Sequence, residues 1–384
     1  MALSEAVPVL RELRLRNFRN FEDVHLVFPD AGAAIIGDNG AGKTNLLEAV
    51  YYLEIFRSFR GAADEQLVRF GADAFHIRGV FHDPSSGRDV EITAAYEAST
   101  RTKRVRIDGV EQTRLADAIG RVAAVVFSPS DVELVAASPA ERRRYLDIVL
   151  SLSSRGYLEA LQRYRHALRQ RNAVLRGFAD EAVTGAFEPA LVAAGSLLMA
   201  ERSSWVDRHA ARFAAVYAAI SGGTAAWMRY KPDVRVDGTI DEATSAAAFQ
   251  TALARVARKE RERRVTLAGP HRDDVAFLMA TAEGDVDLRE FGSGGQLRTG
   301  AIALRLIEAA TIEDARGRVH VVLLDDVFAE LDPGRSRRIV ELFREARRGQ
   351  VIMTAPKESD VELAPFEGSG APARWSIAGG RVRS

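Results

Sequence analysis

The stretch GDNGAGKTN, residues 37–45, follows an apolar run at residues 33–36 and precedes Leu46, Leu47 and Val50, which recur at helical spacing. The order predicts a strand, a glycine-rich turn and a helix. The stretch fits the pattern G-x-x-x-x-G-K-[ST], in which successive backbone N–H groups surround a phosphate, the lysine reaches the β- and γ-phosphates, and the hydroxyl faces Mg²⁺. The alternative is a plain glycine turn, but a chance match is improbable in a chain with so few lysines. We therefore predict a phosphate-binding loop formed by Gly37, Asp38, Asn39, Gly40, Ala41, Gly42, Lys43, Thr44 and Asn45.

A second element has the composition of a strand that supplies a carboxylate to the metal. Residues 321–324 are Val-Val-Leu-Leu, and Asp325 and Asp326 follow directly. We expect Asp325, together with Thr44, to hold Mg²⁺. The predicted catalytic residues are Asp326, which acts on an attacking water, and Lys43, which reaches the β- and γ-phosphates. Strands that end in two acids also occur without catalysis, so the prediction depends on the pairing with the phosphate loop.

A third motif lies about 30 residues before the two acids, where Ser-Gly-Gly-Gln precedes a helical pattern. The backbone N–H groups of such a turn face outward at a helix N-terminus, where anions bind; the alternative is a flexible loop that merely starts a helix. The motif resembles the signature of the ABC ATPases, which contacts the γ-phosphate held by the other subunit. That resemblance implies a homodimer with two ATP molecules between two heads, and it extends to residues 329–332 as a D-loop and to Thr354 as a switch residue. The nucleotide contacts implied in this way are Ser293, Gly294, Gly295, Gln296 and Asp332.

The composition limits the remaining possibilities. There is no cysteine in the 384 residues, which excludes disulfides, thiolate metal sites and a cysteine nucleophile. We see neither an apolar run of roughly 20 residues nor a secretory pattern at the start, so we expect a cytoplasmic chain without a membrane span. The formal net charge is zero, so any DNA binding must come from local basic faces.

The pattern along the chain predicts an interrupted α/β domain. Strands are expected at residues 10–15, 24–28, 33–36 and 122–127, with a β-hairpin layer around residues 90–107. From about residue 138 to residue 264 the pattern is helical, and an α/β pattern resumes after Gly269 and Pro270. We therefore predict a P-loop ATPase head of the ABC type, built from residues 1–130 and 268–384, into which a helical arm of residues 131–267 is inserted.

Across nearly the whole chain the sequence resembles the RecF family of bacterial DNA replication and repair proteins, which belongs to the SMC-like ABC ATPases. The matching stretches are RLRNFRN at 14–20, GDNGAGKTN at 37–45, VRIDG at 105–109, FSP at 127–129, RRRYLD at 142–147, RQRN at 169–172, GPHRDD at 269–274, and LDDV at 324–327. The resemblance implies an ATP-dependent DNA-binding dimer with weak ATPase activity that acts with RecO and RecR to place RecA on gapped DNA. A transporter ATPase subunit is the first alternative, although Lys43 and Ser293 lie much further apart than in such subunits. An SMC or Rad50-like structural head is the second.

Two positions depart from the ABC pattern. Asp326 stands where most of these ATPases carry glutamate, so we expect slow turnover; and there is no secure counterpart of the glutamine that contacts Mg²⁺, although Ser128, Pro129 and Ser130 follow the corresponding strand. Basic clusters at residues 101–106, 142–144, 163–176 and 255–264 are each compatible with a solvated surface. For double-stranded and gapped DNA bound without sequence specificity, we predict Arg104 and Arg106 as contacts.

Overall fold

The computed structural model describes residues 9–83, 87–177, 181–316, 321–328, 332–345, 349–361, 366 and 371–383. By its internal contacts the chain separates into two compact units, the first formed by Met1–Asp131 and Glu308–Ser384 and the second by Val132–Ile307. The first unit is therefore built from both ends of the chain. The sequence-based boundaries after residues 130 and 267 stay a prediction about domains.

The first unit contains a mainly parallel six-stranded sheet in the order β15-β14-β3-β13-β12-β8. Its central strand β3 pairs in parallel with β13 and β14, and β12 pairs in parallel with β13 and β8. Because parallel strands share a direction, their carboxyl ends lie along one edge of the sheet, where α/β proteins bind ligands. The strands are β3 (Gly32–Ile36), β8 (Ala124–Phe127), β12 (Val321–Asp325), β13 (Val351–Ala355), β14 (Ala373–Ala378) and β15 (Arg381–Arg383).

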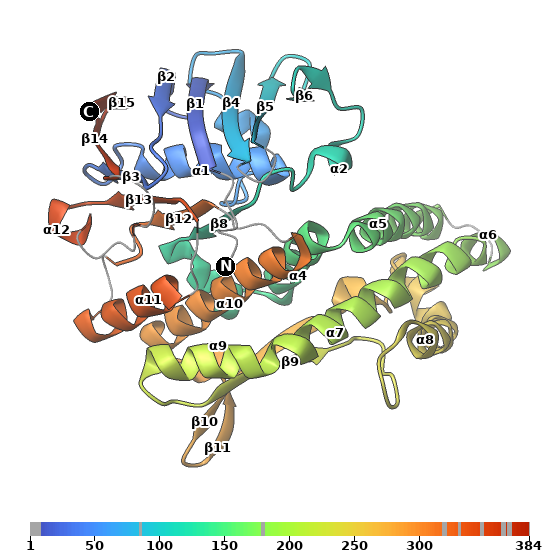
Figure 1. The fold of residues 1–384 in the computed structure, drawn as a ribbon. Coiled ribbons are helices and arrows are strands. Elements are labelled where there is room, and N and C mark those ends of the chain that lie inside the picture. Colours follow the sequence, from blue (N-terminus) through green and yellow to red (C-terminus); the bar gives the residue numbers. More distant parts are fainter. Residues whose placement is uncertain are drawn as a thin grey trace. The chain divides into compact units, whose positions relative to one another are not determined.

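The same unit contains an antiparallel sheet in the order β2-β1-β4-β5-β6-β7. Helix α1 (Lys43–Ile55) lies between the two sheets (Figure 1) and is largely buried, including the side chain of Glu48, which pairs with Arg19. Helix α11 (Pro333–Glu345) lies on the other face of the parallel sheet, where Phe343 packs on Phe127. The antiparallel strands are β1 (Val9–Phe18), β2 (Phe21–Val27), β4 (Ala74–Asp83), β5 (Arg88–Glu97), β6 (Thr102–Ile107) and β7 (Val110–Glu111), and the short helices of this unit are α2 (Leu115–Ala118) and α12 (Glu358–Val361).

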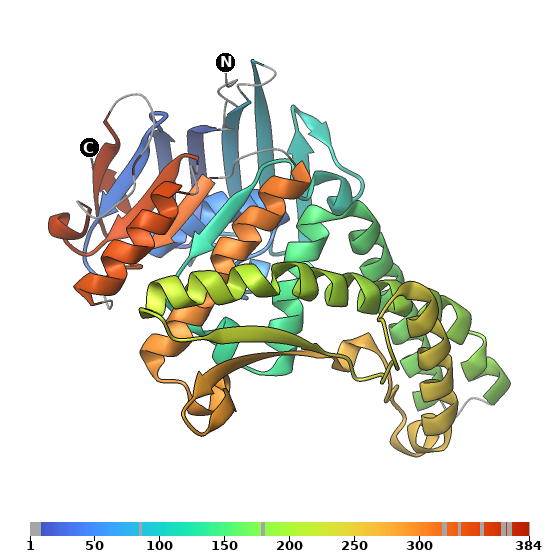
Figure 2. The same ribbon diagram turned by 60° about the horizontal axis from the view of Figure 1, so that its bottom comes forward.

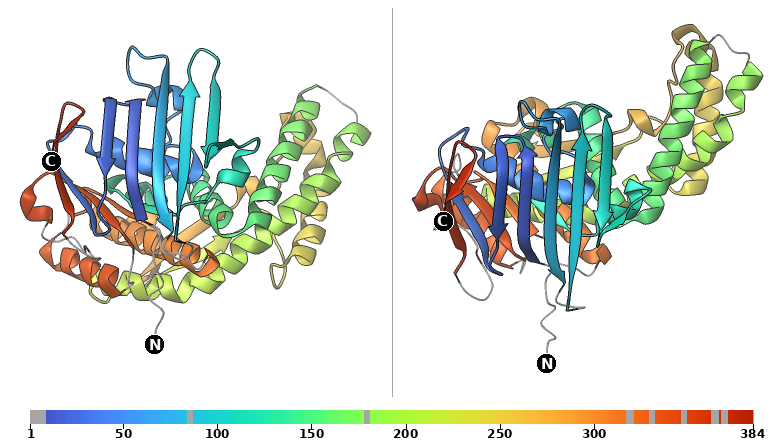
Figure 3. Two further views of the ribbon diagram at one scale, coloured as in Figure 1. Left: turned by 45° about the horizontal axis from the view of Figure 1, so that its top comes forward. Right: turned by 90° about the horizontal axis from the view of Figure 1, so that it is seen from above.

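The second unit is built on the long helix α7 (Glu188–Ser221), which runs across strand β9 (Ala226–Lys231) of a three-stranded sheet (Figure 2). Helices α5 (Arg155–Arg176) and α8 (Glu242–Arg263) flank α7 and form a three-helix bundle with it (Figure 3). The face of α5 that carries Tyr157, Leu161, Tyr164 and Arg171 is buried. The remaining elements are α3 (Glu133–Ala136), α4 (Pro139–Ser153), α6 (Glu181–Gly185), β10 (Asp274–Thr281), β11 (Gly284–Asp287), α9 (Leu288–Phe291) and α10 (Gly294–Arg316), which continues into the first unit.

The structure corrects the helical pattern in one place. The region from 138 to 264 contains a strand, β9, which pairs in antiparallel fashion with β10 from Asp274 to Met279. Residues 226–231 alternate apolar and polar side chains, but the run is short and lies between two helices. Its strand conformation is fixed by a partner that lies more than 40 residues further along the chain.

One described segment, Val183–Ser221, has the length and apolar composition to cross a membrane. It consists mainly of α7, whose side chains Leu191, Leu198, Trp205 and Phe213 are buried in the core of the second unit. A helix that lies in the core of a protein passes the same test of length and composition, so we interpret α7 as a core helix.

Candidate functional site: the phosphate loop and the strand-end acids

The phosphate loop follows β3 and continues into the first turn of α1. Asp38, Asn39 and Gly40 are exposed, whereas the Lys43 side chain is only 4% exposed. The Nζ atom of Lys43 donates to the backbone oxygens of Gly37, at 2.7 Å, and of Asp38, at 3.3 Å. The Lys43 side chain therefore crosses the inside of the loop, and its ammonium group lies where a phosphate group would bind.

Thr44 and Asp325 meet at the carboxyl edge of the parallel sheet, although 281 residues separate them in sequence. The Thr44 Oγ1 atom lies 2.8 Å from Oδ1 and 3.0 Å from Oδ2 of Asp325. Burial raises the pKa of Asp325, while hydrogen bonds from Thr44 and Thr354 oppose the shift. A hydroxyl and a buried carboxylate are oxygen ligands suited to Mg²⁺, which proteins commonly hold with one or two carboxylates plus the phosphates of a nucleotide. The donor set thus fits the predicted metal.

Thr354, at the end of β13, connects the two acids. Its Oγ1 atom lies 2.9 Å from Asp325 Oδ1 and 3.1 Å from Asp326 Oδ1, and it accepts from the Asp326 backbone N–H at 3.0 Å. A hydroxyl has a single proton, so it donates to only one of the two carboxylates at a time. Asp326 has a φ of 46°, in the left-handed region, and its Oδ2 atom lies 3.5 Å from Lys43 Nζ. Both predicted catalytic side chains, Lys43 and Asp326, therefore face one another.

Sequence reasoning missed the side chain that braces this loop, Asn20 in the turn between β1 and β2. Its Nδ2 atom donates to the backbone oxygen of Ala41 at 2.9 Å, and its Oδ1 atom accepts from Asn45 Nδ2 at 2.8 Å. Gly42 has a φ of 112°, and a Cβ atom there would lie 2.3 Å from Asn20 Nδ2. The glycine is needed both for its backbone conformation and for the close approach of Asn20. The only signal in the sequence was that Asn20 belongs to the RNFRN stretch.

The signature residues lie in the second unit, at the start of α10. The Ser293 backbone N–H donates to Gln296 Oε1 at 2.8 Å, and the Gln296 N–H donates to Ser293 Oγ at 3.3 Å. The two side chains therefore cap the helix reciprocally. Ser293 and Gly294 are exposed and Gly295 is partly exposed, so this helix N-terminus is open to a ligand from outside the unit.

The remaining predicted site residues are Asp332, Arg104 and Arg106. Asp332 caps α11 by accepting from the Arg335 backbone N–H at 2.9 Å, a bond that lowers the pKa of Asp332. Residues 329–331, the rest of the proposed D-loop, lie outside the described residues. Arg104 and Arg106 are both exposed on β6, where Arg106 Nη2 lies 3.3 Å from Glu111 Oε2. Their role in DNA binding stays a prediction.

A second cluster of buried charge lies around Arg202 on α7. Its guanidinium donates to Tyr157 Oη at 3.0 Å, to Asp147 at 2.9 Å, and to Asp273 and the Pro270 carbonyl at 2.9 and 2.7 Å. Asp273 also accepts from Tyr230. Every nitrogen of this guanidinium thus has a protein partner, so we interpret the cluster, which includes the GPHRDD stretch, as a structural junction of α4, α5, α7 and β9.

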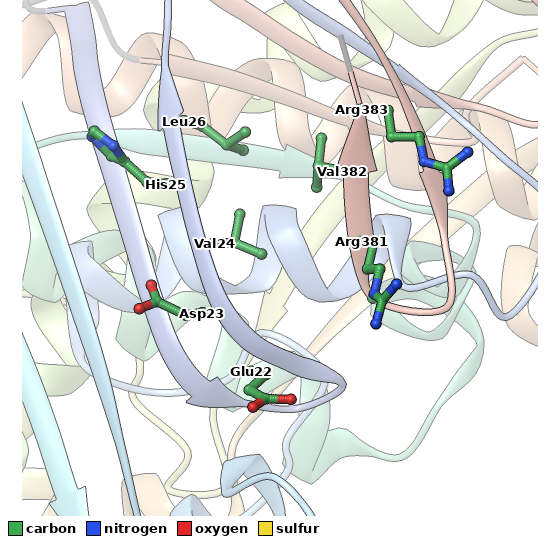
Figure 4. Close-up of a pocket in the computed structure, with 9 residues that line it drawn as sticks. Glu22, Asp23, Val24, His25, Leu26, Arg381, Val382 and Arg383 are labelled. Atoms are coloured by element: carbon green, nitrogen blue, oxygen red, sulfur yellow. The ribbon is translucent and has the colours of Figure 1, made fainter.

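A groove of about 630 Å³ lies between β2 and β15 (Figure 4). Val24 and Leu26 point toward Val382 across it, whereas Asp23 and His25 point to the other side of β2 (Figure 4). Charged side chains of both signs also line the groove, among them Glu22, Arg381 and Arg383. No residue of the phosphate loop lines it, so the groove is separate from that site.

A phosphate loop on a parallel sheet, two acids at the end of a neighbouring strand and an antiparallel sheet over the loop helix define an ABC-type head of the SMC kind. The family model "RecF/RecN/SMC N terminal domain" matches residues 9–367. The Smc head domain of Pyrococcus furiosus shares the fold, with a TM-score of 0.56 at 15% identity, over 98% of this chain and 95% of that one.

Two curated relatives, both named DNA replication and repair protein RecF, match over most of their length. The protein of Moorella thermoacetica is 36% identical over 97% of this chain and 95% of that protein, and that of Salinibacter ruber is 34% identical over 93% and 87%. A solved structure of the recombination mediator protein RecF-ATP in the RecFOR pathway superposes with a TM-score of 0.89, at 28% identity, over 100% of this chain and 99% of that one. The chain belongs to the RecF family. This result favours a DNA replication and repair protein over a transporter subunit.

Proposed function

We propose that this protein binds ATP and Mg²⁺ at the phosphate loop and uses the nucleotide to control a dimer that holds DNA. The observation that carries the proposal is the convergence of Lys43, Thr44, Asp325 and Asp326 at one sheet edge. The solved RecF-ATP structure, which is 28% identical over the whole chain, supports the choice of nucleotide.

The residues divide the chemistry between them. Thr44 and Asp325 would hold the metal, which when bound neutralises charge on the β- and γ-phosphates. Lys43 contributes a second positive charge from inside the loop, and the exposed backbone N–H groups of residues 38–40 bind phosphate oxygens. Asp326 orients the attacking water and accepts its proton, while Thr354 fixes the Asp326 backbone. Because Asp326 is shorter than glutamate by one methylene, we expect slow hydrolysis that acts as a timing switch.

The dimer part of the proposal rests on the open end of α10. Ser293 and Gly294 are exposed, and because the Ser293 N–H already donates to Gln296, the groups offered to a ligand are the Ser293 hydroxyl proton and the Gly294 N–H. We propose that these groups bind the γ-phosphate held by a second copy, and that Asp332 lies at the same interface. RecO and RecR as partners, a cytoplasmic location and action at single-strand gaps are part of the proposal by family membership.

DNA retention tests the nucleotide control. We would measure filter retention of a duplex with ATP, with a non-hydrolysable analogue and without nucleotide, for the wild type and for Lys43→Met. The exposed Lys357 provides a matched control, Lys357→Met, because it loses the same charge elsewhere in the first unit. We expect strong retention with the analogue, weaker retention with ATP as it is hydrolysed, and loss only in Lys43→Met. Equal retention in every condition would rule out nucleotide control.

Sedimentation tests the dimer separately. We expect the molecular weight to double only with nucleotide, and we expect Ser293→Arg to remain monomeric while it still binds nucleotide, because a bulky cation at the start of α10 blocks the second copy. A dimer that forms equally well without nucleotide would contradict the sandwich. Ser153→Arg is the matched control, since Ser153 is also partly exposed in the second unit but lies at the end of α4.

A further inference from the structure

One end of the three-helix bundle in the second unit carries a dense group of cations. Residues 255–264, the last part of α8 and its C-cap, contain six basic residues and two acids. The basic residues are all exposed: Arg255, Arg258, Lys259, Arg261, Arg263 and Arg264. Arg169 and Arg176, seven residues apart on α5, are also exposed and share one face of that helix. We call these eight residues the arm cluster.

Buried contacts hold the two basic segments side by side. Arg171 of α5 lies 2.7 Å from Glu260 of α8, and its Nη1 atom lies 3.0 Å from Thr266 Oγ1. Asn172 Oδ1 accepts from both the backbone N–H and the hydroxyl of Thr266, each at 2.8 Å. Arg171 and Glu260 are both almost completely buried, so breaking this junction would expose an unpaired charge to an apolar environment. These contacts therefore hold the last turns of α5 against the last turns of α8, so the exposed cations of both helices gather at one end of the bundle, with Arg169 and Arg176 on the side of α5 away from Arg171.

The acidic side chains Glu188, Glu260 and Glu262, near the arm cluster, already form ion pairs. Glu260 and Glu188 pair with Arg171, and Glu262 pairs with Arg258. Among the residues that the structure describes, no carboxylate lies within ion-pair distance of Arg255, Lys259 or Arg263. These three cations thus give the surface a positive charge that the described neighbouring side chains do not neutralise.

Helix stability alone does not explain the arm cluster. Cations near a helix C-terminus are favourable, but the effect fades beyond the last turn. Arg255 lies eight residues before Arg263, the last residue of α8, and Arg258 and Lys259 also precede the last turn. The cluster also lacks the aromatic side chains that dominate protein interfaces, and its one exposed large apolar neighbour among the described residues is Val265. Charge complementarity without apolar anchors favours a phosphate backbone over an acidic protein surface.

We propose that the arm cluster is a second DNA-binding surface, which contacts the sugar–phosphate backbone without reading its sequence. The site lies in the second unit and is separate from Arg104 and Arg106 of the first. The inference rests on the proposed function in so far as it assumes that the protein binds DNA, and it names the part of the chain that does so.

The test compares two triple variants with equal loss of charge. The first is Arg255→Gln, Lys259→Gln and Arg263→Gln. The control is Arg229→Gln, Lys231→Gln and Arg235→Gln, three exposed residues of the same unit that lie on or after β9. Affinity for a 40-base-pair duplex would be measured against salt concentration with the analogue bound. Each phosphate that no longer meets a cation should lower the slope of log K against log salt by about 0.9, so we expect a decrease of roughly three for each arm that contacts the duplex in the first variant, and none in the control.

A third variant separates charge from folding. Arg255→Lys with Arg263→Lys keeps the cations, and because lysine also binds phosphate as a point charge, we expect wild-type affinity and salt slope. An unchanged slope in the glutamine variant, or an equal loss in the control, would overturn the proposal; binding of an acidic protein with unchanged DNA affinity would assign the surface to that partner instead. If the wild type itself binds no DNA with any nucleotide, the proposed function fails first, and the two failures are thereby distinguished.

Discussion

The phosphate loop of the first unit and the Arg202 cluster of the second both contain buried side chains of opposite charge. The two sites differ in the partners of those side chains. Lys43 donates to two backbone carbonyls and lies 3.5 Å from Asp326, and Asp325 is bonded to two threonine hydroxyls. These partners exchange readily when a phosphate or a cation arrives. Arg202 instead has two carboxylates, a phenol and a carbonyl fixed around it. Burial of charge alone therefore does not identify a ligand site. A ligand site is indicated when the buried charges have partners that a phosphate or a cation can replace, next to exposed backbone N–H groups.

The largest expected change is a loss of stability, caused by a substitution that disrupts the Arg202 cluster. Arg202→Met leaves Asp147 and Asp273 buried with fewer donors, so we expect the free energy of unfolding to fall by roughly 3–5 kcal/mol. Urea unfolding measures this change. Arg208→Met on the same helix is the control, because Arg208 is exposed and should cost less than about 0.5 kcal/mol. If Arg202→Met were as stable as the wild type, the Arg202 cluster would not be a structural junction and its contrast with the phosphate loop would fail.

The second largest expected change is in nucleotide affinity, and it tests the phosphate loop as a ligand site. Thr44→Val keeps the shape of the side chain but removes the hydroxyl that faces Asp325, so nucleotide affinity with Mg²⁺ should fall by roughly 2 kcal/mol, about thirtyfold. Calorimetric titration with Mg²⁺ and again with EDTA checks the reason, since the loss should disappear without the metal. Thr281→Val, an exposed threonine at the end of β10, should bind nucleotide normally. An equal loss with EDTA would show that Thr44 acts on the loop and not on the metal.

A smaller change in nucleotide affinity should distinguish Asn20 from Asn172, which form hydrogen bonds in different units of the chain. Asn20→Ala removes the bonds to Ala41 and Asn45, so the loop should lose its preorganisation and bind nucleotide about tenfold more weakly, a change of about 1.4 kcal/mol. Asn172→Ala removes the bonds to Thr266 in the arm and should lower stability without any change in nucleotide affinity. Titration and urea unfolding of both variants give the answer. Weaker nucleotide binding in both would mean that general destabilisation, and not local bracing, is responsible.

The sequence predicted that the phosphate loop and the two acids would lie together, because that grouping depends on residue types at fixed spacings; their roles stay a prediction. Lys43, Thr44, Asp325 and Asp326 converge in the structure although they come from opposite ends of the chain. Asn20 could not be predicted in the same way, because its role follows from the space left by Gly42. Arg202 gave no signal either, since a single arginine within an apolar helix indicates nothing until its partners from α4, α5 and β9 are placed around it.

The smallest expected effect concerns rate and not binding. Asp326→Glu restores the longer carboxylate found in most ABC ATPases, and its extra methylene should bring the base closer to the attacking water. We expect ATP turnover to rise about threefold, under about 1 kcal/mol in activation free energy, with nucleotide affinity unchanged. Steady-state phosphate release measures the turnover, and Asp73→Glu, which alters an exposed acid of the first unit outside the site, should leave it unchanged. A fall in turnover for Asp326→Glu would mean that the left-handed backbone and Thr354 already place the shorter acid correctly, so that slow hydrolysis has another cause.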